Sequence, residues 1–168
     1  MAILDLFKGK KKVSDAVTFP AMLGSVSNGT YVPMSEIPDD IFSSGTLGIC
    51  CGIEPSEGKV YAPISGTIGA IADSLHAVGM ESAEMELMIH VGIDTVEMNG
   101  DGFNVVVKNG QHVNKGDLLL TMDLEKIKAA DHPSTIIMAV TNSDAFAEIK
   151  AVGFGDVLAG DDVLEVCK

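Results

Sequence analysis

Two histidines, His76 and His90, lie in neighbouring segments whose residue pattern is typical of strands. From Met85 to Val91 every second residue is apolar, and His90 falls on the more polar side. Such alternation predicts a strand with one buried face, so we expect His90 on the outer face. The preceding segment is predicted to be a second strand, with His76, Val78 and Met80 on one side.

The two strands are predicted to form a hairpin that turns about Ala83. His76 and His90 are equally distant from Ala83, so they would sit directly opposite each other and point to the same face, with Cβ atoms ~4.5–5.5 Å apart. A register slip of one residue would instead place them on opposite faces. The hairpin therefore predicts a small surface site with two imidazoles, bordered by Val78, Met80 and Met88.

One chemistry open to two facing imidazoles is phosphoryl transfer. A neutral imidazole nitrogen can attack phosphorus and form a phosphohistidine. The second imidazole and the hydroxyl of Ser74 would then hydrogen-bond the phosphoryl oxygens. This interpretation uses the residues present, and the alternative is that His76 and His90 are ordinary surface residues of a hairpin.

The other chemistry is metal binding, because imidazoles on adjacent strands suit zinc. His90 and Asp94 have the H-x-x-x-D spacing found in some zinc peptidases, but the H-x-H that accompanies it there is absent from the chain. A zinc-dependent hydrolase on a related β scaffold is therefore kept as the alternative function.

The charge of the chain narrows the class of partner. The 168 residues include 24 acidic residues against 11 basic ones, all of them Lys, for a formal net charge of −13. Nucleic acid is excluded as a partner, because binding it needs a basic face. The apolar, methionine-containing surroundings of the histidines indicate a docking surface for another protein, and a basic protein would complement the acidic surface.

Short apolar runs, separated by Gly, Pro, Asn and Asp, follow one another from Thr18 onward. Residues 25–32 resemble 62–69, and residues 113–120 resemble 157–164, with a Gly-Asp pair in each member of the second couple. These patterns predict an all-β fold, an antiparallel sandwich or barrel of two similar motifs. One short helix is expected at 124–130 and another turn or two at 143–148.

We expect residues 1–15 to form a flexible tail and residues 16–168 a single β domain. The tail carries Ile3, Leu4, Leu6 and Phe7 before several lysines, so at most a weak contact with an anionic membrane surface is expected, and a frayed terminus is the alternative. Three cysteines make no disulfide framework, which favours a cytoplasmic location.

One distinctive motif of the chain is His90-Val-Gly-Ile-Asp-Thr-Val96. Further motifs lie across about residues 25–166, at 37–42, 47–48, 60–68, 76–77, 86–87, 100–103, 110–113 and 116–117. With these motifs in this order, the chain resembles the glucose-type IIA component of the bacterial phosphoenolpyruvate-dependent sugar phosphotransferase system, and the motif at 90–96 is the most specific piece.

The resemblance implies a β-sandwich and a phosphotransferase without a tightly bound cofactor. It implies that His90 receives the phosphoryl group from the carrier protein HPr and passes it to a cysteine of a sugar-specific IIB domain. His76 would be the auxiliary imidazole, Ser74 takes a position usually held by Thr, and the carbonyl of Gly92 would hold the other ring nitrogen of His90.

The resemblance also implies a docking patch around His90, with Asp39 and Asp94 on its rim and an apolar centre formed by Phe42, Leu47, Val78, Met80, Met88 and Val96. Two features depart from the family pattern: a hairpin turn shorter by one residue, and Ile49-Cys50-Cys51 where Gly-Asp-Gly is usual. A regulatory module that has lost transfer stays open as an alternative. So does the question of whether the chain is free-standing or part of a larger permease.

Overall fold

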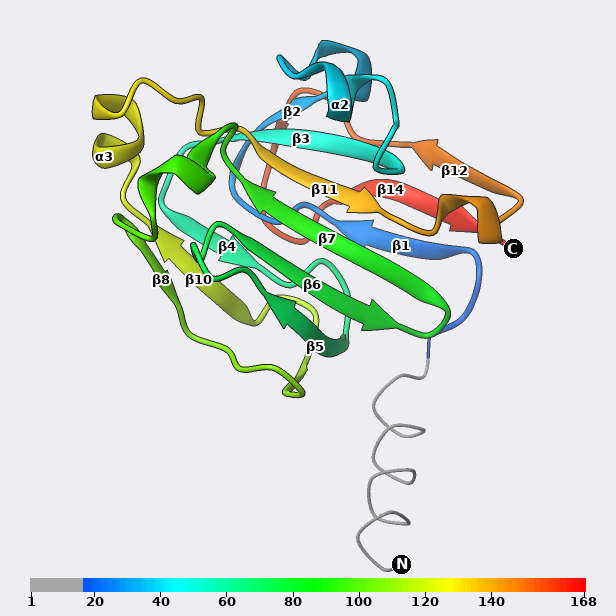
Figure 1. Cartoon of the computed structure of the whole chain (residues 1–168). Coiled ribbons are helices and arrows are strands. Elements are labelled where there is room, and N and C mark those ends of the chain that lie inside the picture. Colours follow the sequence, from blue (N-terminus) through cyan, green and yellow to red (C-terminus); the bar gives the residue numbers. More distant parts are fainter. Residues whose placement is uncertain (1–16) are drawn as a thin grey trace, which may run out of the picture.

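The computed structural model describes residues 17–168 (Figure 1). The expectations for residues 1–15, a tail and its weak membrane contact, lie outside this range. Within residues 17–168 no helix has both the length and the apolar composition needed to cross a membrane.

Residues 17–168 form an antiparallel β structure with little helix, which confirms the expected fold class. The helical elements are η1 (Met34–Glu36), α2 (Asp40–Ser43), η2 (Thr95–Met98), α3 (Leu124–Ala129) and η3 (Ser143–Ala145). The strands are β1 (Ala21–Gly24), β2 (Gly29–Val32), β3 (Ile49–Pro55), β4 (Lys59–Tyr61), β5 (Gly66–Ile71), β6 (Ala77–Ser82), β7 (Met85–Val91), β8 (Phe103–Val105), β9 (His112–Val113), β10 (Leu118–Met122), β11 (Ile136–Val140), β12 (Glu148–Ala151), β13 (Asp156–Val157) and β14 (Asp162–Cys167).

The described strands lie in three antiparallel sheets. The largest has eight strands in the order β13-β2-β3-β11-β7-β6-β5-β9, and two three-stranded sheets have the orders β1-β14-β12 and β4-β10-β8. Figure 1 shows β7 and β11 side by side, with β1 and β14 behind them. The strand that carries His90 is therefore central in its sheet, where neighbours on both sides hold it in place.

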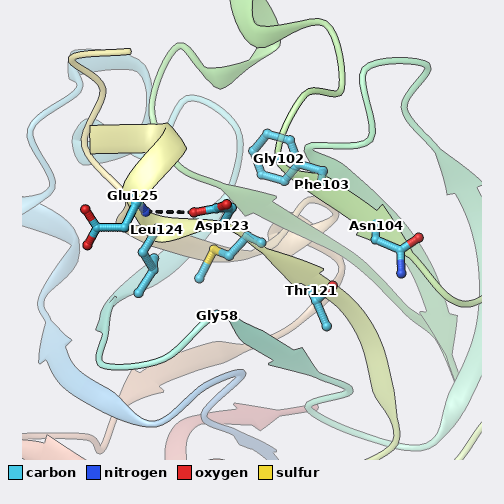
Figure 2. A pocket seen from close by; sticks show the side chains of 9 residues that line it. Gly58, Gly102, Phe103, Asn104, Thr121, Asp123, Leu124 and Glu125 are labelled. Atoms are coloured by element: carbon cyan, nitrogen blue, oxygen red, sulfur yellow. Dashed lines mark hydrogen bonds between the residues drawn. The ribbon is translucent and has the colours of Figure 1, made fainter. Parts of the chain in front are cut away.

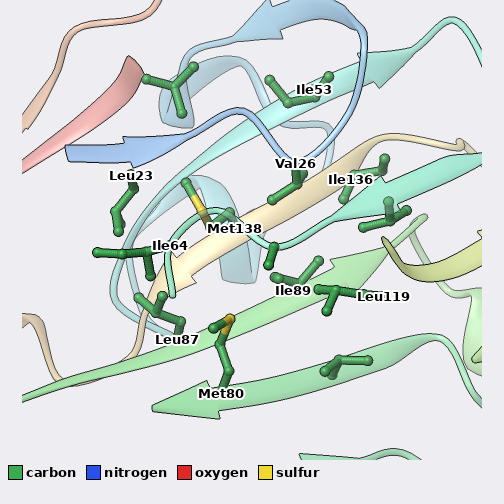
Figure 3. Close-up of a cluster of buried hydrophobic side chains, with 14 of the residues drawn as sticks. Leu23, Val26, Ile53, Ile64, Met80, Leu87, Ile89, Leu119, Ile136 and Met138 are labelled. Carbon is green, nitrogen blue, oxygen red and sulfur yellow. The ribbon is translucent and has the colours of Figure 1, made fainter. Parts of the chain in front are cut away.

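The main core lies between these sheets (Figure 3). Leu23 from β1, Ile89 from β7 and Leu119 from β10 are all fully buried in it. Burial of each such side chain contributes about 1.5–3 kcal/mol to folding. The alternation of β7 therefore has the expected physical basis, because its apolar side faces this core.

A second, smaller apolar cluster covers the opposite face of the large sheet, and we call it the outer cluster. Its buried members are Ile37, Phe42, Cys50, Ile93, Ile137 and Ala139. All five residues of β11 are buried, because the main core lies on one side of that strand and the outer cluster on the other. The outer cluster is on the side of the sheet that carries His90, since Ile137 pairs directly with His90.

The first pair of internal repeats is joined by two backbone hydrogen bonds, one donated from each repeat to the other. The amide of Gly24 donates to the carbonyl of Pro63 at 2.9 Å, and the amide of Tyr61 donates to the carbonyl of Val26 at 2.7 Å. Gly24 and Tyr61 take equivalent positions in the two repeats, as do Val26 and Pro63. The two similar motifs are therefore joined by a pair of crossed bonds about an approximate two-fold axis.

The Gly-Asp turns repeat in the same way. A carboxylate oxygen of Asp117 accepts from the amide of Asn114, and one of Asp161 accepts from the amide of Leu158, both at 2.8 Å. Aspartate was expected here because its side chain can bond neighbouring amides in a turn. Each turn is also bonded to the first residue of one of the other repeats. The amide of Gly116 donates to the carbonyl of Ala62, and the amide of Gly160 donates to the carbonyl of Ser25.

Candidate functional site

The hairpin formed by β6 and β7 carries the two histidines, but its register differs from the expected one. Ser82 pairs with Met85, so the turn consists of Ala83 and Glu84 rather than being centred on Ala83. His90 therefore pairs with Ala77 and not with His76. The expected register is wrong by one residue, because a two-residue turn puts the centre of the hairpin between residues 83 and 84.

The register decides which side of β6 faces the core. Val78 pairs with Ile89 and Met80 pairs with Leu87, so both side chains point into the main core, where their exposed fractions are 0% and 2%. The expectation that Val78 and Met80 line a docking patch is therefore wrong. A slip of one residue exchanges the two faces of a strand, and it moves these side chains from the surface to the interior.

The two imidazoles nevertheless meet. Their ring centroids are 4.9 Å apart, and the rings are nearly perpendicular at 82°. His76 precedes the first residue of β6 and follows Leu75, which has a left-handed φ of 61°, so the alternation of the strand does not set the direction of its side chain. The carbonyl of His76 accepts from the amide of Val91 at 2.7 Å, which holds the segment beside β7.

The ring of His90 is fixed by a single backbone contact. Its Nδ1 lies 2.8 Å from the carbonyl oxygen of Gly92. A carbonyl only accepts hydrogen bonds, so Nδ1 carries the proton and Nε2 has its lone pair free. The Phe42 ring packs against the imidazole, with a centroid distance of 5.1 Å. The arrangement leaves Nε2 as the nucleophilic atom of this ring.

Both histidines have lowered pKa values. Burial lowers the pKa of His90, and a charge on His76 lowers it further, while the Gly92 carbonyl, Asp39 and Asp94 oppose the shift. Burial also lowers the pKa of His76, against a backbone contact with Ser74. Both rings are therefore neutral at pH 7, the state in which an imidazole acts as a nucleophile.

The sequence profile of one protein family matches residues 21–146, three quarters of the chain. Its description is the phosphoenolpyruvate-dependent sugar phosphotransferase system, EIIA 1. The chain belongs to this EIIA family. As an EIIA domain it is a phosphoryl carrier and phosphotransferase of sugar transport, which supports the first of the chemistries considered above over a zinc-dependent hydrolase.

Curated relatives resemble this EIIA domain over most of its length. The β-glucoside-specific EIIBCA component of Halalkalibacterium halodurans is 40% identical over 147 residues, which are 87% of the chain and 23% of that protein. The glucose-specific EIICBA component of Staphylococcus saprophyticus is 37% identical over 140 residues, 83% of the chain and 20% of that protein. The chain thus spans about a fifth of the length of these relatives.

A solved structure supports the same assignment. Glucose permease IIA from Mycoplasma capricolum superposes with a TM-score of 0.76 at 30% sequence identity. The match covers 86% of this chain and 94% of that one. The fold of the EIIA domain is therefore the IIA β-sandwich.

Phe42 packs against the ring of His90, and Asp39 and Asp94 lie near enough to affect the pKa of that ring. Asp39 caps α2, and its Oδ1 accepts from the amides of Ile41 and Phe42. Leu47 and Val96 are exposed, at 39% and 49%, whereas Phe42 is largely buried and Met88 half-buried against the outer cluster. Ile41, next to Phe42 in the matching piece 37–42, is exposed at 54%, and sequence reasoning did not name it.

The EIIA domain also has a hollow that is lined by residues other than the two histidines (Figure 2). It is lined by β8, β10 and the start of α3. β8 and β10 belong to the sheet β4-β10-β8, whereas His90 lies in the eight-stranded sheet. Its aspartate, Asp123, is engaged in capping α3 through the amides of Glu125 and Lys126. Neither histidine lines this hollow.

The adjacent cysteines of the EIIA domain lie in β3, beneath this face. Cys50 and Cys51 are both buried, as small apolar residues would be. Burial raises the pKa of the Cys50 thiol to about 11, and it raises the pKa of Cys51 as well. Both thiols are therefore protonated at neutral pH. Within residues 17–168 no three or more His, Cys, Asp and Glu side chains form a group that could hold a metal ion.

The neutral state of His90 gives a pH prediction. Because its pKa is lowered, the ring stays neutral as the pH falls through about 6.5, the ordinary value for histidine. We expect the His90 ring signals in an NMR titration to change only below that pH. Phosphorylation by pre-phosphorylated HPr should stay constant down to the same point and then fall. Ring signals already half-shifted near pH 7 would contradict this expectation.

Gly92 cannot be replaced without moving its neighbours. Its φ is +80°, and an added Cβ would lie 2.4 Å from Cγ2 of Thr95 and 3.0 Å from the carbonyl oxygen of Pro133. We expect Gly92→Ala to lower the free energy of unfolding by about 3 kcal/mol, through left-handed strain plus steric overlap. Thermal or denaturant unfolding measures the loss.

Gly110→Ala is the matched control for Gly92→Ala. Gly110 has a similar φ of +83°, but an added Cβ would meet no atom within 4 Å. Its substitution should cost only the backbone strain, about 1–2 kcal/mol. If the two variants lose the same free energy of unfolding, the overlap with Thr95 and Pro133 contributes nothing to the effect of Gly92→Ala.

Proposed function

We propose that His90 is the residue that carries the phosphoryl group, on Nε2. The observation that carries this proposal is the contact between Nδ1 and the carbonyl oxygen of Gly92, which leaves the Nε2 lone pair free on a neutral ring. In the first step this lone pair attacks the phosphorus of a donor phosphohistidine. The new N–P bond forms as the donor N–P bond breaks, and the donor imidazole leaves.

His76 and Ser74 are proposed to assist the transfer. The ring of His76 meets that of His90 edge to face at 4.9 Å, so its nitrogen can donate to a phosphoryl oxygen near Nε2. Ser74 lies half-buried two residues before His76, and its hydroxyl would provide a further donor. Such donors stabilise the charge that develops on the equatorial oxygens during transfer.

The proposed donor is HPr and the proposed acceptor is a cysteine of a IIB domain. In the second step the cysteine thiolate attacks phosphorus, an S–P bond forms, and the N–P bond to His90 breaks. The names of the relatives support an exchange with a IIB domain, because in those proteins the A component is joined to B and C components. We place this exchange in the cytoplasm, where HPr and the IIB domain would meet the EIIA domain.

The docking surface proposed for both partners is the exposed apolar set Ile41, Leu47 and Val96 with half-buried Met88. Asp39 and Asp94 lie near enough to His90 to influence its charge, so they form an acidic edge. The net charge of −13 adds to the attraction for a basic partner. Complementary charges of this kind mainly raise the rate of association.

The test is reconstitution with phosphoenolpyruvate, enzyme I and HPr. We expect the chain to gain one phosphate that is labile in acid and stable in base, as a phosphohistidine is. Addition of a purified IIB domain should remove that phosphate. Failure to label in the presence of phosphorylated HPr would contradict carriage and leave a regulatory module. Stoichiometric zinc with peptidase activity in the purified protein would instead favour the hydrolase.

A further inference from the structure

The loop after β7 holds the Gly92 carbonyl that His90 requires. The amide of Gly92 donates to the carbonyl of Thr135 at 2.9 Å, and the amide of Ile93 donates to the carbonyl of Pro133 at 3.0 Å. The N–H of Ile93 and the C=O of Gly92 belong to one planar peptide and point in opposite directions. Anchoring the N–H to Pro133 therefore aims the carbonyl of Gly92 away from that anchor.

Thr95 closes the same loop with its side chain. Its hydroxyl donates to the carbonyl of Val91 at 2.5 Å, and the residue is fully buried. Its methyl group stands against Gly92, since Cγ2 is the atom nearest to the position of an added Cβ there. The Thr95 side chain therefore makes two contacts with the loop: its hydroxyl bonds the carbonyl of Val91, and its methyl group packs against Gly92.

We propose that Thr95 is a positioning residue for phosphoryl transfer, which keeps the Gly92 carbonyl in line with Nδ1 of His90. The proposal rests on the proposed function, in which His90 is the acceptor. If the hydroxyl is removed, the 91–95 loop loses one of the bonds that hold it, and the Gly92 carbonyl is aimed less firmly at Nδ1 of His90. The ring of His90 then populates the other tautomer, in which Nε2 carries the proton and cannot attack phosphorus.

The two substituents of the Thr95 Cβ can be separated by substitution. Thr95→Val keeps the shape and removes the hydroxyl, whereas Thr95→Ser keeps the hydroxyl and removes the methyl group. The ¹⁵N NMR signals of the His90 ring report the tautomer in the unphosphorylated chain. The initial rate of labelling by phosphorylated HPr reports the transfer.

We expect Thr95→Val to shift the His90 ring signals toward the second tautomer and to slow labelling about tenfold, since small misplacements of reacting groups have large effects on rate. Thr95→Ser should retain the wild-type ring signals and most of the rate. Thr95→Ala, which removes the hydroxyl without filling its place, repeats the test if the valine variant does not fold.

Ser82→Ala is the matched control, because Ser82 is equally buried and its hydroxyl donates to the carbonyl of Ser65 at 2.6 Å, at the other end of β6. It should lower the melting temperature and leave both the ring signals and the rate unchanged. Wild-type ring signals in folded Thr95→Val or Thr95→Ala would overturn the proposal, as would an equal loss in Thr95→Ser. The tautomer is read without phosphate, so labelling at a residue other than His90 would overturn the proposed function alone.

Discussion

His90→Ala is expected to abolish labelling of the chain by phosphoenolpyruvate, enzyme I and HPr. The loss should be complete rather than partial, because alanine offers no nucleophile and the proposed chemistry has no other route to an N–P bond. The ring of His76, whose centroid is 4.9 Å from that of His90, is proposed to assist the transfer and not to form the N–P bond itself. Phosphate incorporation, followed by radiolabel or intact mass, measures the result.

His112→Ala is the control for this experiment. His112 begins β9, at the far edge of the eight-stranded sheet, and pairs with Thr67 rather than with any residue of the hairpin. Its replacement should leave labelling at the wild-type level. Undiminished labelling of His90→Ala, in a protein that remains folded, would reject His90 as the carrier.

His76→Gln is expected to separate acceptance of the phosphoryl group from its delivery. The variant should still be labelled by HPr, because Nε2 of His90 stays free, but its transfer to a IIB cysteine should be slower by roughly 10²-fold, the usual effect of losing one donor that stabilises a transition state. Single-turnover transfer from the pre-labelled chain to a IIB domain measures the second step alone.

His132→Gln provides the matched control for His76→Gln. The Nε2 atom of His132 lies 3.6 Å from Glu97, so it has a partner outside the imidazole pair. This variant should accept and deliver as the wild-type chain does. Wild-type delivery by His76→Gln would refute the auxiliary role of His76.

The local pattern of the sequence predicted the strand that carries His90, but it did not predict the pairing of that strand. The alternation over Met85–Val91 can be read from the residue types alone, and the apolar residues of this strand are indeed buried in the main core. Register depends on the turn, and the two-residue turn at Ala83 and Glu84 carries no glycine that would have marked it. The histidines meet outside the strand pairing, since His76 lies just before β6 and follows Leu75, whose φ is left-handed.

The error in register also affected the predicted docking surface. Val78 and Met80 were expected on the surface only because they were assigned to the same face as His76, and the observed register puts both in the core. Ile41 was missed because exposure of a residue in a one-turn helix depends on how α2 sits on the outer cluster. Leu47 and Val96 were expected from the resemblance, and both are exposed.

The repeats were the part of the fold most open to prediction. The Gly-Asp turns depend on local chemistry, and each aspartate makes the expected bond to a nearby amide. The crossed bonds between Gly24 and Pro63 and between Tyr61 and Val26 join segments far apart in the chain. Similarity of two segments shows that they fold alike, but only packing decides that they face each other.

His90 is half-buried beside Phe42, and both proposed partners must reach the same Nε2 atom. A standard docking footprint covers about 800 Å² on each protein, so HPr and the IIB domain cannot be bound at once. Transfer must then follow a ping-pong sequence, in which dephosphorylated HPr and the IIB domain compete for the same surface around His90. Release of each proposed partner must therefore precede binding of the next one.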